Sequence, residues 1–264
     1  MSEELRSGVR AERRGGIAIW TIDRPDRANA LSRDVVRELG RLAREAGGDR
    51  SLRGVVITGA GDRVFSAGAD LKERQGMSEE EVRDFLSLYR VSFGAIDRLP
   101  VPVVAALDGS AYGGGLELAL ACDLRVAAAH VEVGLTETSL GIIPGAGGTQ
   151  RLVRLVGPAR AKRLILFARR ISATEAHAIG LVDEVAPAGR RALDVALQWL
   201  EPMQRAAPIA IAAALEAIDA ATETPLEVGL SVERTCYERT LGTEDRLEAL
   251  AAFREKRPPV FRGR

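Results

Sequence analysis

The chain has 264 residues, of which 46% are hydrophobic and 28% are charged, and its formal net charge at pH 7 is zero. This length can bury a full hydrophobic core, and the balanced charge excludes a general attraction to nucleic acid or anionic membranes. Two cysteines and two histidines disfavour a disulfide framework or a zinc site. No apolar run is long enough for a membrane span, and the start, MSEELRSGVR, has no signal-peptide stretch. We therefore expect a cytoplasmic protein.

The first quarter of the chain contains two predicted strands and one predicted helix. Residues 17–22 (IAIWTI) and 55–58 (VVIT) are apolar and β-branched, which is typical of strands. Between them, apolar residues recur at helical spacing over residues 31–46.

Further helix starts are indicated by capping boxes. Ser78, Ser172 and Thr224 are each followed three positions later by a glutamate, so that each pair can satisfy the first N–H groups of a helix. Pro225 would stand at the first helical position, where its missing N–H costs nothing.

Strand patterns end near residue 190. Short strands are predicted in the middle of the chain at 101–107, 124–128 and 131–134. The remainder has a helical pattern over 191–206, 208–221, 225–241 and 244–257. We therefore predict an α/β core over residues 1–190 and an all-helical C-terminal region over residues 191–264.

Three consecutive glycines at 113–115 precede an apolar run, LELALACDL, that is predicted to form a buried helix. Glycine permits close backbone approach to a ligand, and a helix start presents unpaired N–H donors. These donors could stabilise an oxygen that gains negative charge, although a tightly packed turn explains the glycines equally well. Glu117 favours the functional interpretation, because a carboxylate in so apolar a helix is rarely buried without a partner or a task.

A second carboxylate, Glu137, lies in the turn-rich segment GLTETSLGIIPGAGGTQRL at 134–152. Two carboxyl groups beside one oxyanion site are typical of proton transfer to and from a substrate. The sequence does not show that Glu117 and Glu137 lie close together in space. If they do, one of them should stay protonated, because two nearby carboxylates do not easily ionise together. The glycines could instead bind phosphate, but the Lys-Ser/Thr ending of a P-loop is missing.

A third segment, FSAGADLKER at 65–74, has small residues that permit close backbone approach, and its Lys72 could meet a phosphate. Two other patterns are rejected. Gly59 and Gly61 follow a strand but lack the third glycine and the helix of a dinucleotide-binding fingerprint. Ser110 does not lie in a nucleophile-elbow pattern.

Together, these three segments resemble the crotonase superfamily, the enoyl-CoA hydratase/isomerase family, and the resemblance extends over nearly the whole chain. It implies a spiral of ββα turns, followed by a helical region that forms trimers, often paired into hexamers. It also implies an acyl-CoA substrate and no metal or redox cofactor, since coenzyme A arrives as part of the substrate.

The resemblance also assigns roles to individual residues. The N–H groups of Ala69 and Gly114 correspond to the family's oxyanion donors, and Glu117 and Glu137 correspond to its two catalytic glutamates. Members that lack one glutamate commonly isomerise double bonds, so the presence of both favours a hydratase. The implied contacts to the acyl-CoA are Ala67, Ala69, Asp70, Leu71, Lys72, Gly114 and Gly145, the last of which also corresponds to a glycine that helps position water.

Several sequence blocks, including ADLKER and GGGLELALACDLRVAA, are similar to one branch of the family, the methylglutaconyl-CoA hydratases of leucine degradation. Their substrate carries a second carboxylate. Bases in the mobile-looking stretch 74–90, or in the run 254–257 of the same or a neighbouring subunit, could bind it. A general short-chain enoyl-CoA hydratase and an enoyl-CoA isomerase remain as alternatives.

An RNA-binding protein with a secondary hydratase site is an alternative of a different class. The animal member of the same branch binds AU-rich RNA through a basic helix. A similar stripe at helical spacing is formed here by Arg33, Arg37, Arg41 and Arg44. Glutamates flank this arginine stripe, so a solvated charged face explains it equally well, and we expect any RNA binding to be weak.

Overall fold

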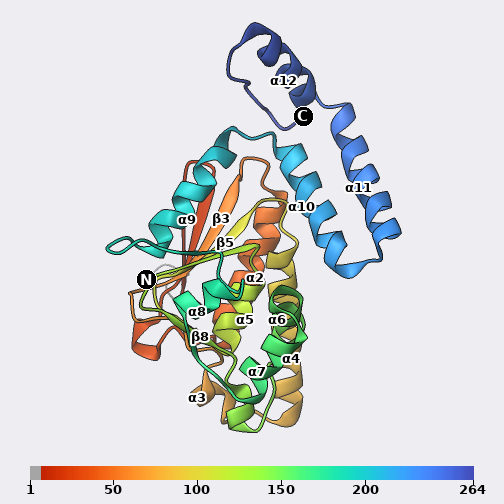
Figure 1. Cartoon of the computed structure of the whole chain (residues 1–264). Helices are drawn as coiled ribbons and strands as arrows, with labels where there is room; N and C mark the ends of the chain where they lie inside the picture. The colour runs from red at the N-terminus through yellow and green to blue at the C-terminus, as the bar shows by residue number, and fades with distance from the viewer. Residues whose placement is uncertain (1–6) are drawn as a thin grey trace.

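Two β-sheets and the helices packed on them make up the body of the chain (Figure 1), and the computed structural model describes residues 7–264. The first six residues, MSEELR, therefore lie outside the described residues. The expectation that the start of the chain lacks a signal-peptide stretch falls mostly on these residues. The larger sheet contains β1 (Val9–Arg14), β2 (Ile17–Ile22), β3 (Gly54–Gly59), β5 (Val103–Leu107), β7 (Leu124–Ala127) and β10 (Glu184–Val185). The smaller sheet contains β4 (Val64–Ser66), β6 (Ser110–Tyr112), β8 (Glu132–Gly134) and β9 (Ile171–Ser172).

The helices fall into a group on the body and a group at the C-terminus. Those on the body are α2 (Arg33–Gly48), α3 (Leu71–Arg74), α4 (Glu79–Asp97), α5 (Gly114–Leu120), α6 (Gly148–Val156), α7 (Pro158–Leu166), α8 (Ala173–Ala178) and α9 (Ala192–Leu200). The C-terminal helices are α10 (Pro208–Glu223), α11 (Leu226–Leu241) and α12 (Glu244–Glu255). Short 3₁₀ turns are η1 (Pro25–Arg27), η2 (Glu137–Leu140) and η3 (Glu201–Arg205).

The larger sheet is buried on both faces. Its strand order is β1-β2-β3-β5-β7-β10, and from β2 to β10 each neighbouring pair is parallel. On one face Ile17, Ile19 and Val56 pack with residues of α9, whereas on the other Trp20 and Ile57 join the main core with residues of α2 and α4. Helices on both faces explain why the central strands β2, β3 and β5 are mostly apolar, as is typical of parallel sheets.

The chain passes repeatedly from the larger sheet to the smaller one. The pairs β3–β4, β5–β6 and β7–β8 each place their first strand in the larger sheet and their second in the smaller sheet. Helical segments follow each pair, namely α3 and α4, then α5, and then η2 and α6. This repeat is the predicted spiral of ββα turns, and it stacks the segments that follow β4, β6 and β8 beside one another.

The C-terminal helices α10, α11 and α12 extend away from the body (Figure 1). The predicted division at residue 190 falls just before α9, and α9 packs on the larger sheet through Leu193 and Val195. The part that stands away from the sheets therefore begins with α10. No helix in the described part of the chain combines the length and the apolar character needed to cross a membrane.

Most long sequence patterns predicted their elements well. The strand predicted at 17–22 coincides with β2, and α2 begins after Ser32, which caps it by accepting a hydrogen bond from Val35 N–H. The capping box at Ser78 is present with both of its hydrogen bonds. At Ser172 the hydroxyl accepts from Glu175 N–H as predicted, while the Glu175 carboxylate pairs with Arg169.

Two predictions at the start of α11 were wrong. Thr224 does not form a capping box, because its hydroxyl donates to Ala220 O at the end of α10, and Pro225 is the cap of α11 rather than its first helical residue. The stretch 74–90 contains the start of α4, which follows Ser78 as its capping box predicted and packs against α2. The buried face of α4 carries the aromatic residues Phe85, Tyr89 and Phe93.

Candidate active site

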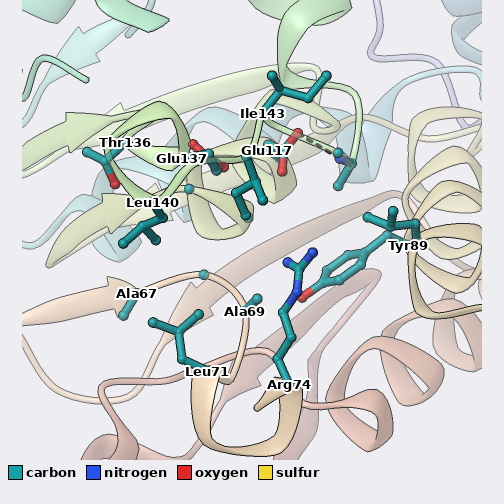
Figure 2. Close-up of a pocket in the computed structure, with 17 residues that line it drawn as sticks. Ala67, Ala69, Leu71, Arg74, Tyr89, Glu117, Thr136, Glu137, Leu140 and Ile143 are labelled. Carbon is teal, nitrogen blue, oxygen red and sulfur yellow. Dashed lines mark hydrogen bonds between the residues drawn. The ribbon is translucent and has the colours of Figure 1, made fainter. Parts of the chain in front are cut away.

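A cavity of about 520 Å³ is lined by segments that are far apart in the sequence. These segments are 67–74 after β4, part of α4, the start of α5, and the residues from Thr136 to Ala146. Figure 2 shows that the carboxyl groups of Glu117 and Glu137 lie near each other on one side of this cavity. The structure thus brings together two glutamates that the sequence alone could not place side by side.

Glu117 lies in the first turn of α5, and only 3% of its surface is exposed. Its Oε1 accepts hydrogen bonds from the N–H of Ala146 at 2.8 Å and from the N–H of Gly148 at 2.7 Å. Burial raises the pKa of Glu117, although these two N–H groups act in the opposite direction. The carboxylate is therefore held in one orientation by the backbone at the start of α6.

Glu137 is the first residue of η2, and 9% of its surface is exposed. Neither of its carboxyl oxygens has a hydrogen-bond partner among the described residues. Burial, and then the charge of Glu117, raise the pKa of Glu137 to about 7. A carboxyl group with this pKa can hold a proton near neutral pH and also release it.

Two backbone N–H groups, of Ala69 and Gly114, stand beside this pair. In the described chain neither donates a hydrogen bond to a protein acceptor. Gly68 explains how the two segments approach so closely: it has φ +87°, and a Cβ on it would lie 2.9 Å from Gly114 N. The segments after β4 and β6 thus form a pair of free donors, the arrangement expected of an oxyanion hole.

The remaining predicted contact residues divide into two groups. Ala67, Leu71 and Gly145 line the cavity together with the residues described above. Asp70 and Lys72 do not line it. Asp70 is buried, caps α3 by accepting from Glu73 N–H, and pairs with Arg24 at 3.0 Å. The Lys72 side chain is exposed.

Several residues of the cavity were missed by sequence reasoning. Leu86 and Tyr89 reach it from α4, and the Tyr89 hydroxyl donates to Leu31 O at 3.2 Å. The donors to Glu117, Ala146 and Gly148, were also missed. The only signal for them was the glycine-rich character of the segment at 134–152, which indicated a backbone-rich site without naming its acceptor.

The arrangement can perform acid–base chemistry beside a carbonyl group. One carboxyl group is oriented by N–H donors, the other tends to keep a proton, and two free N–H groups can stabilise an oxygen that gains negative charge. Within residues 7–264, no group of three or more His, Cys, Asp or Glu residues is placed to hold a metal ion.

Comparisons with known proteins agree with this site. Residues 12–264 match the family described as enoyl-CoA hydratase/isomerase. The Bacillus subtilis protein YngF is 47% identical over 248 residues, which are 94% of this chain and 95% of that protein. The mitochondrial methylglutaconyl-CoA hydratase of Homo sapiens is 44% identical over 268 residues, which are 99% of this chain and 78% of that protein. A crystal structure of an enoyl-CoA hydratase from Bacillus anthracis has a TM-score of 0.94 and 44% identity, and the match covers 97% of this chain and 100% of that chain.

Proposed function

The chain belongs to the enoyl-CoA hydratase/isomerase family and is an enzyme of the hydro-lyase type, and from this premise we propose that it adds water across the double bond of a 2-enoyl-CoA thioester. One observation carries the proposal. The buried carboxyl groups of Glu117 and Glu137 share a cavity with the two free N–H donors of Ala69 and Gly114. No metal or redox cofactor enters the proposed reaction.

The proposed reaction begins with the thioester carbonyl. Its oxygen accepts hydrogen bonds from the N–H groups of Ala69 and Gly114, which draw electrons from the conjugated double bond and make the β-carbon electrophilic. Each such donor is typically worth roughly 3–4 kcal/mol of transition-state stabilisation. A water molecule then attacks the β-carbon, and the negative charge collects on the enolate oxygen between the two donors.

The two glutamates divide the proton transfers between them. Glu117, whose charge is stabilised by the N–H groups of Ala146 and Gly148, accepts a proton from the attacking water. Glu137, whose carboxyl oxygens have no hydrogen-bond partner on another described residue, donates its proton to the α-carbon. The product is a 3-hydroxyacyl-CoA, and transfer of one proton between the glutamates restores the starting state. Acid–base catalysis of this kind contributes about 10²–10⁴-fold in rate.

We propose further that the acyl group is 3-methylglutaconyl and that the product is 3-hydroxy-3-methylglutaryl-CoA, as in leucine degradation. The similarity to the human methylglutaconyl-CoA hydratase over 99% of this chain supports this assignment. A general short-chain enoyl-CoA hydratase and an enoyl-CoA isomerase are the alternatives within the family.

A substrate panel tests both levels of the proposal. Hydration is recognised by the gain of one water in product mass, whereas isomerisation leaves the mass unchanged. We expect kcat/KM for 3-methylglutaconyl-CoA to exceed that for crotonyl-CoA. A preference for crotonyl-CoA of tenfold or more, about 1.4 kcal/mol in transition-state binding, would instead identify a general short-chain hydratase.

A further inference from the structure

Arg74 places a positive charge in an otherwise apolar wall of the cavity. It is the last residue of α3, and among the described residues that line the cavity it is the only cation. The side chains around it on this part of the wall are Leu71, Leu86 and Tyr89. Arg74 is partly buried and its neighbours here are apolar, so an anion bound in the cavity would pair with it favourably.

The carboxylates closest to Arg74 in the sequence are occupied elsewhere. Asp70 pairs with Arg24, and Glu73 accepts a hydrogen bond from the N–H of Arg33. Among residues 7–264, the Arg74 guanidinium has neither an ion pair with an acidic side chain nor a hydrogen bond to a protein acceptor. Its donors are therefore available to a bound molecule.

The position of Arg74 indicates which part of a substrate it meets. Figure 2 shows the Arg74 side chain rising from α3 toward the cavity on the same side as Tyr89, whereas Ala67 and Leu140 lie on the opposite side of the glutamates. The thioester oxygen is fixed near Ala69 if the proposed function holds. The acyl chain and the coenzyme must then leave this point in different directions, and one of these directions ends at Arg74.

We propose that Arg74 binds a carboxylate at the far end of the acyl chain and thereby selects dicarboxylic enoyl-CoA thioesters. Guanidinium presents two parallel N–H donors that match a carboxylate. A substrate that ends in a methyl group leaves these donors without a partner, and an unpaired charged donor is costly. The inference rests on the proposed function, because it assumes that the thioester is held at Ala69 and Gly114.

The other bases considered in the sequence are less well placed. Arg90 is an exposed residue of α4 that does not line the cavity. Arg257 pairs with Glu248 beyond the end of α12, and Figure 1 shows α12 at the opposite end of the molecule from α3. Within one chain, Arg74 is therefore the base that the cavity wall presents to a substrate.

Kinetics on a matched pair of substrates tests the inference. Glutaconyl-CoA and crotonyl-CoA differ only in the terminal carboxylate, so the ratio of their kcat/KM values isolates its recognition. We expect Arg74→Met to lower this ratio by about 10- to 100-fold, the range given by losing a hydrogen bond to a charged group. Arg74→Lys, which keeps the charge but not the paired donors, should lower the ratio less. Arg90→Met, a matched substitution on α4, should leave the ratio unchanged.

Two results would overturn the inference. If Arg74→Met slows both substrates equally, the guanidinium acts on a shared part of the molecule, such as a phosphate of the coenzyme. If it changes neither rate, Arg74 has no part in recognition. Circular dichroism confirms the fold of each variant, and Arg74→Lys supplies the comparison if Arg74→Met does not fold.

A binding measurement separates this inference from the proposed reaction. Glutaryl-CoA and butyryl-CoA are saturated and cannot be hydrated, and they also differ only in the terminal carboxylate. Calorimetry should give a lower Kd for glutaryl-CoA than for butyryl-CoA, and Arg74→Met should abolish this difference. If no enoyl-CoA is hydrated, the proposed function is wrong, yet this pair still tests Arg74. If hydration occurs but the two Kd values are equal, the inference alone is wrong.

Discussion

Glu117 and Glu137 carry the same chemical group in two different surroundings. The Glu117 carboxylate accepts hydrogen bonds from two backbone N–H groups, whereas the Glu137 carboxyl group has no hydrogen-bond partner among the described residues. At Glu117 these donors oppose the effect of burial, whereas at Glu137 burial and the charge of Glu117 both favour the protonated form. This difference is the physical basis for assigning Glu117 the role of base and Glu137 the role of acid.

The first prediction concerns loss of either carboxyl group. We expect Glu117→Gln and Glu137→Gln each to lower kcat by at least about 10²-fold, because each removes one proton transfer. Both variants should fold, since glutamine is isosteric and its carbonyl can still accept from Ala146 and Gly148. Steady-state hydration kinetics measure the effect, and Glu132→Gln, at an exposed position on β8, is the control. Turnover close to wild type in a folded variant would refute the two-glutamate mechanism.

The second prediction concerns stability as a function of pH. Burial and the charge of Glu117 raise the pKa of Glu137 from its ordinary 4.5 to about 7. Between these values the folded protein binds more protons than the unfolded chain, so the free energy of unfolding falls as the pH rises. Glu137→Gln lacks this titration. We therefore expect its Tm, relative to wild type, to increase from pH 4.5 to 7 and then to level off.

Thermal unfolding at several pH values measures this difference. Glu132→Gln serves again as the control, because this residue is exposed and does not line the cavity. A constant Tm difference between Glu137→Gln and wild type across this range would mean that folding does not shift the pKa of Glu137. A further hydrogen-bond donor to the Glu137 carboxylate, beyond the described contacts, would then offset the effect of burial on its pKa.

Sequence reasoning identified the residues whose local motif is distinctive. Glu117 follows a glycine run in an apolar helix, and this combination can be recognised without a structure. The diversion of Asp70 into a pair with Arg24 could not be predicted, because the two residues are 46 positions apart and meet only in the fold. The same holds for Tyr89, which reaches the cavity because α4 packs against α2.

At the scale of elements, predictability followed the length of the pattern. Sixteen-residue α2 and six-residue β2 repeat their periodicity often enough to be recognised. The smaller sheet consists of strands of two or three residues, such as β4 and β9, in which no periodicity can develop. Pairing with neighbouring strands, rather than a local sequence pattern, determines where these short strands form. The same strands position the segments around the cavity.

The third prediction concerns α2, which carries the arginine stripe. Arg37 pairs with Asp34 at 2.7 Å, and Arg41 pairs with both Glu38 and Glu45. Phosphate contacts would have to displace these carboxylates on the same helix. We therefore expect RNA binding to be weak, without preference for AU-rich sequences, and strongly dependent on salt.

A filter-binding or anisotropy titration at physiological salt measures this binding. An AU-rich RNA is compared with a GC-rich RNA of equal length, in the wild type and in the double variant Arg37→Ala, Arg41→Ala. A clear preference for AU-rich RNA that the double variant loses would show that α2 is an RNA-binding surface. In that case the ion pairs on this helix exchange with phosphate more readily than their geometry suggests.

At the scale of the whole molecule, apolar surface is concentrated on the C-terminal helices. Leu226 on α11 is 74% exposed, and Phe253 on α12 is 85% exposed. Ile218 on α10 is 65% exposed. Large exposed apolar groups gathered on helices that stand away from the body are typical of surfaces covered in an assembly. We therefore propose that these helices join copies of the chain into a trimer or a pair of trimers.

The fourth prediction tests this assembly. Light scattering at micromolar concentration should give the mass of a trimer or a hexamer. A chain that stops after residue 206 keeps α9 on the sheet and should give smaller species or aggregates. Phe253→Asp should weaken the assembly, because burying a phenylalanine is worth roughly 1.5–3 kcal/mol in each contact. Arg83→Asp, which changes an exposed polar residue on α4, should leave the mass unchanged. A wild-type chain that remains a stable monomer would show that the apolar faces of α10, α11 and α12 have another purpose.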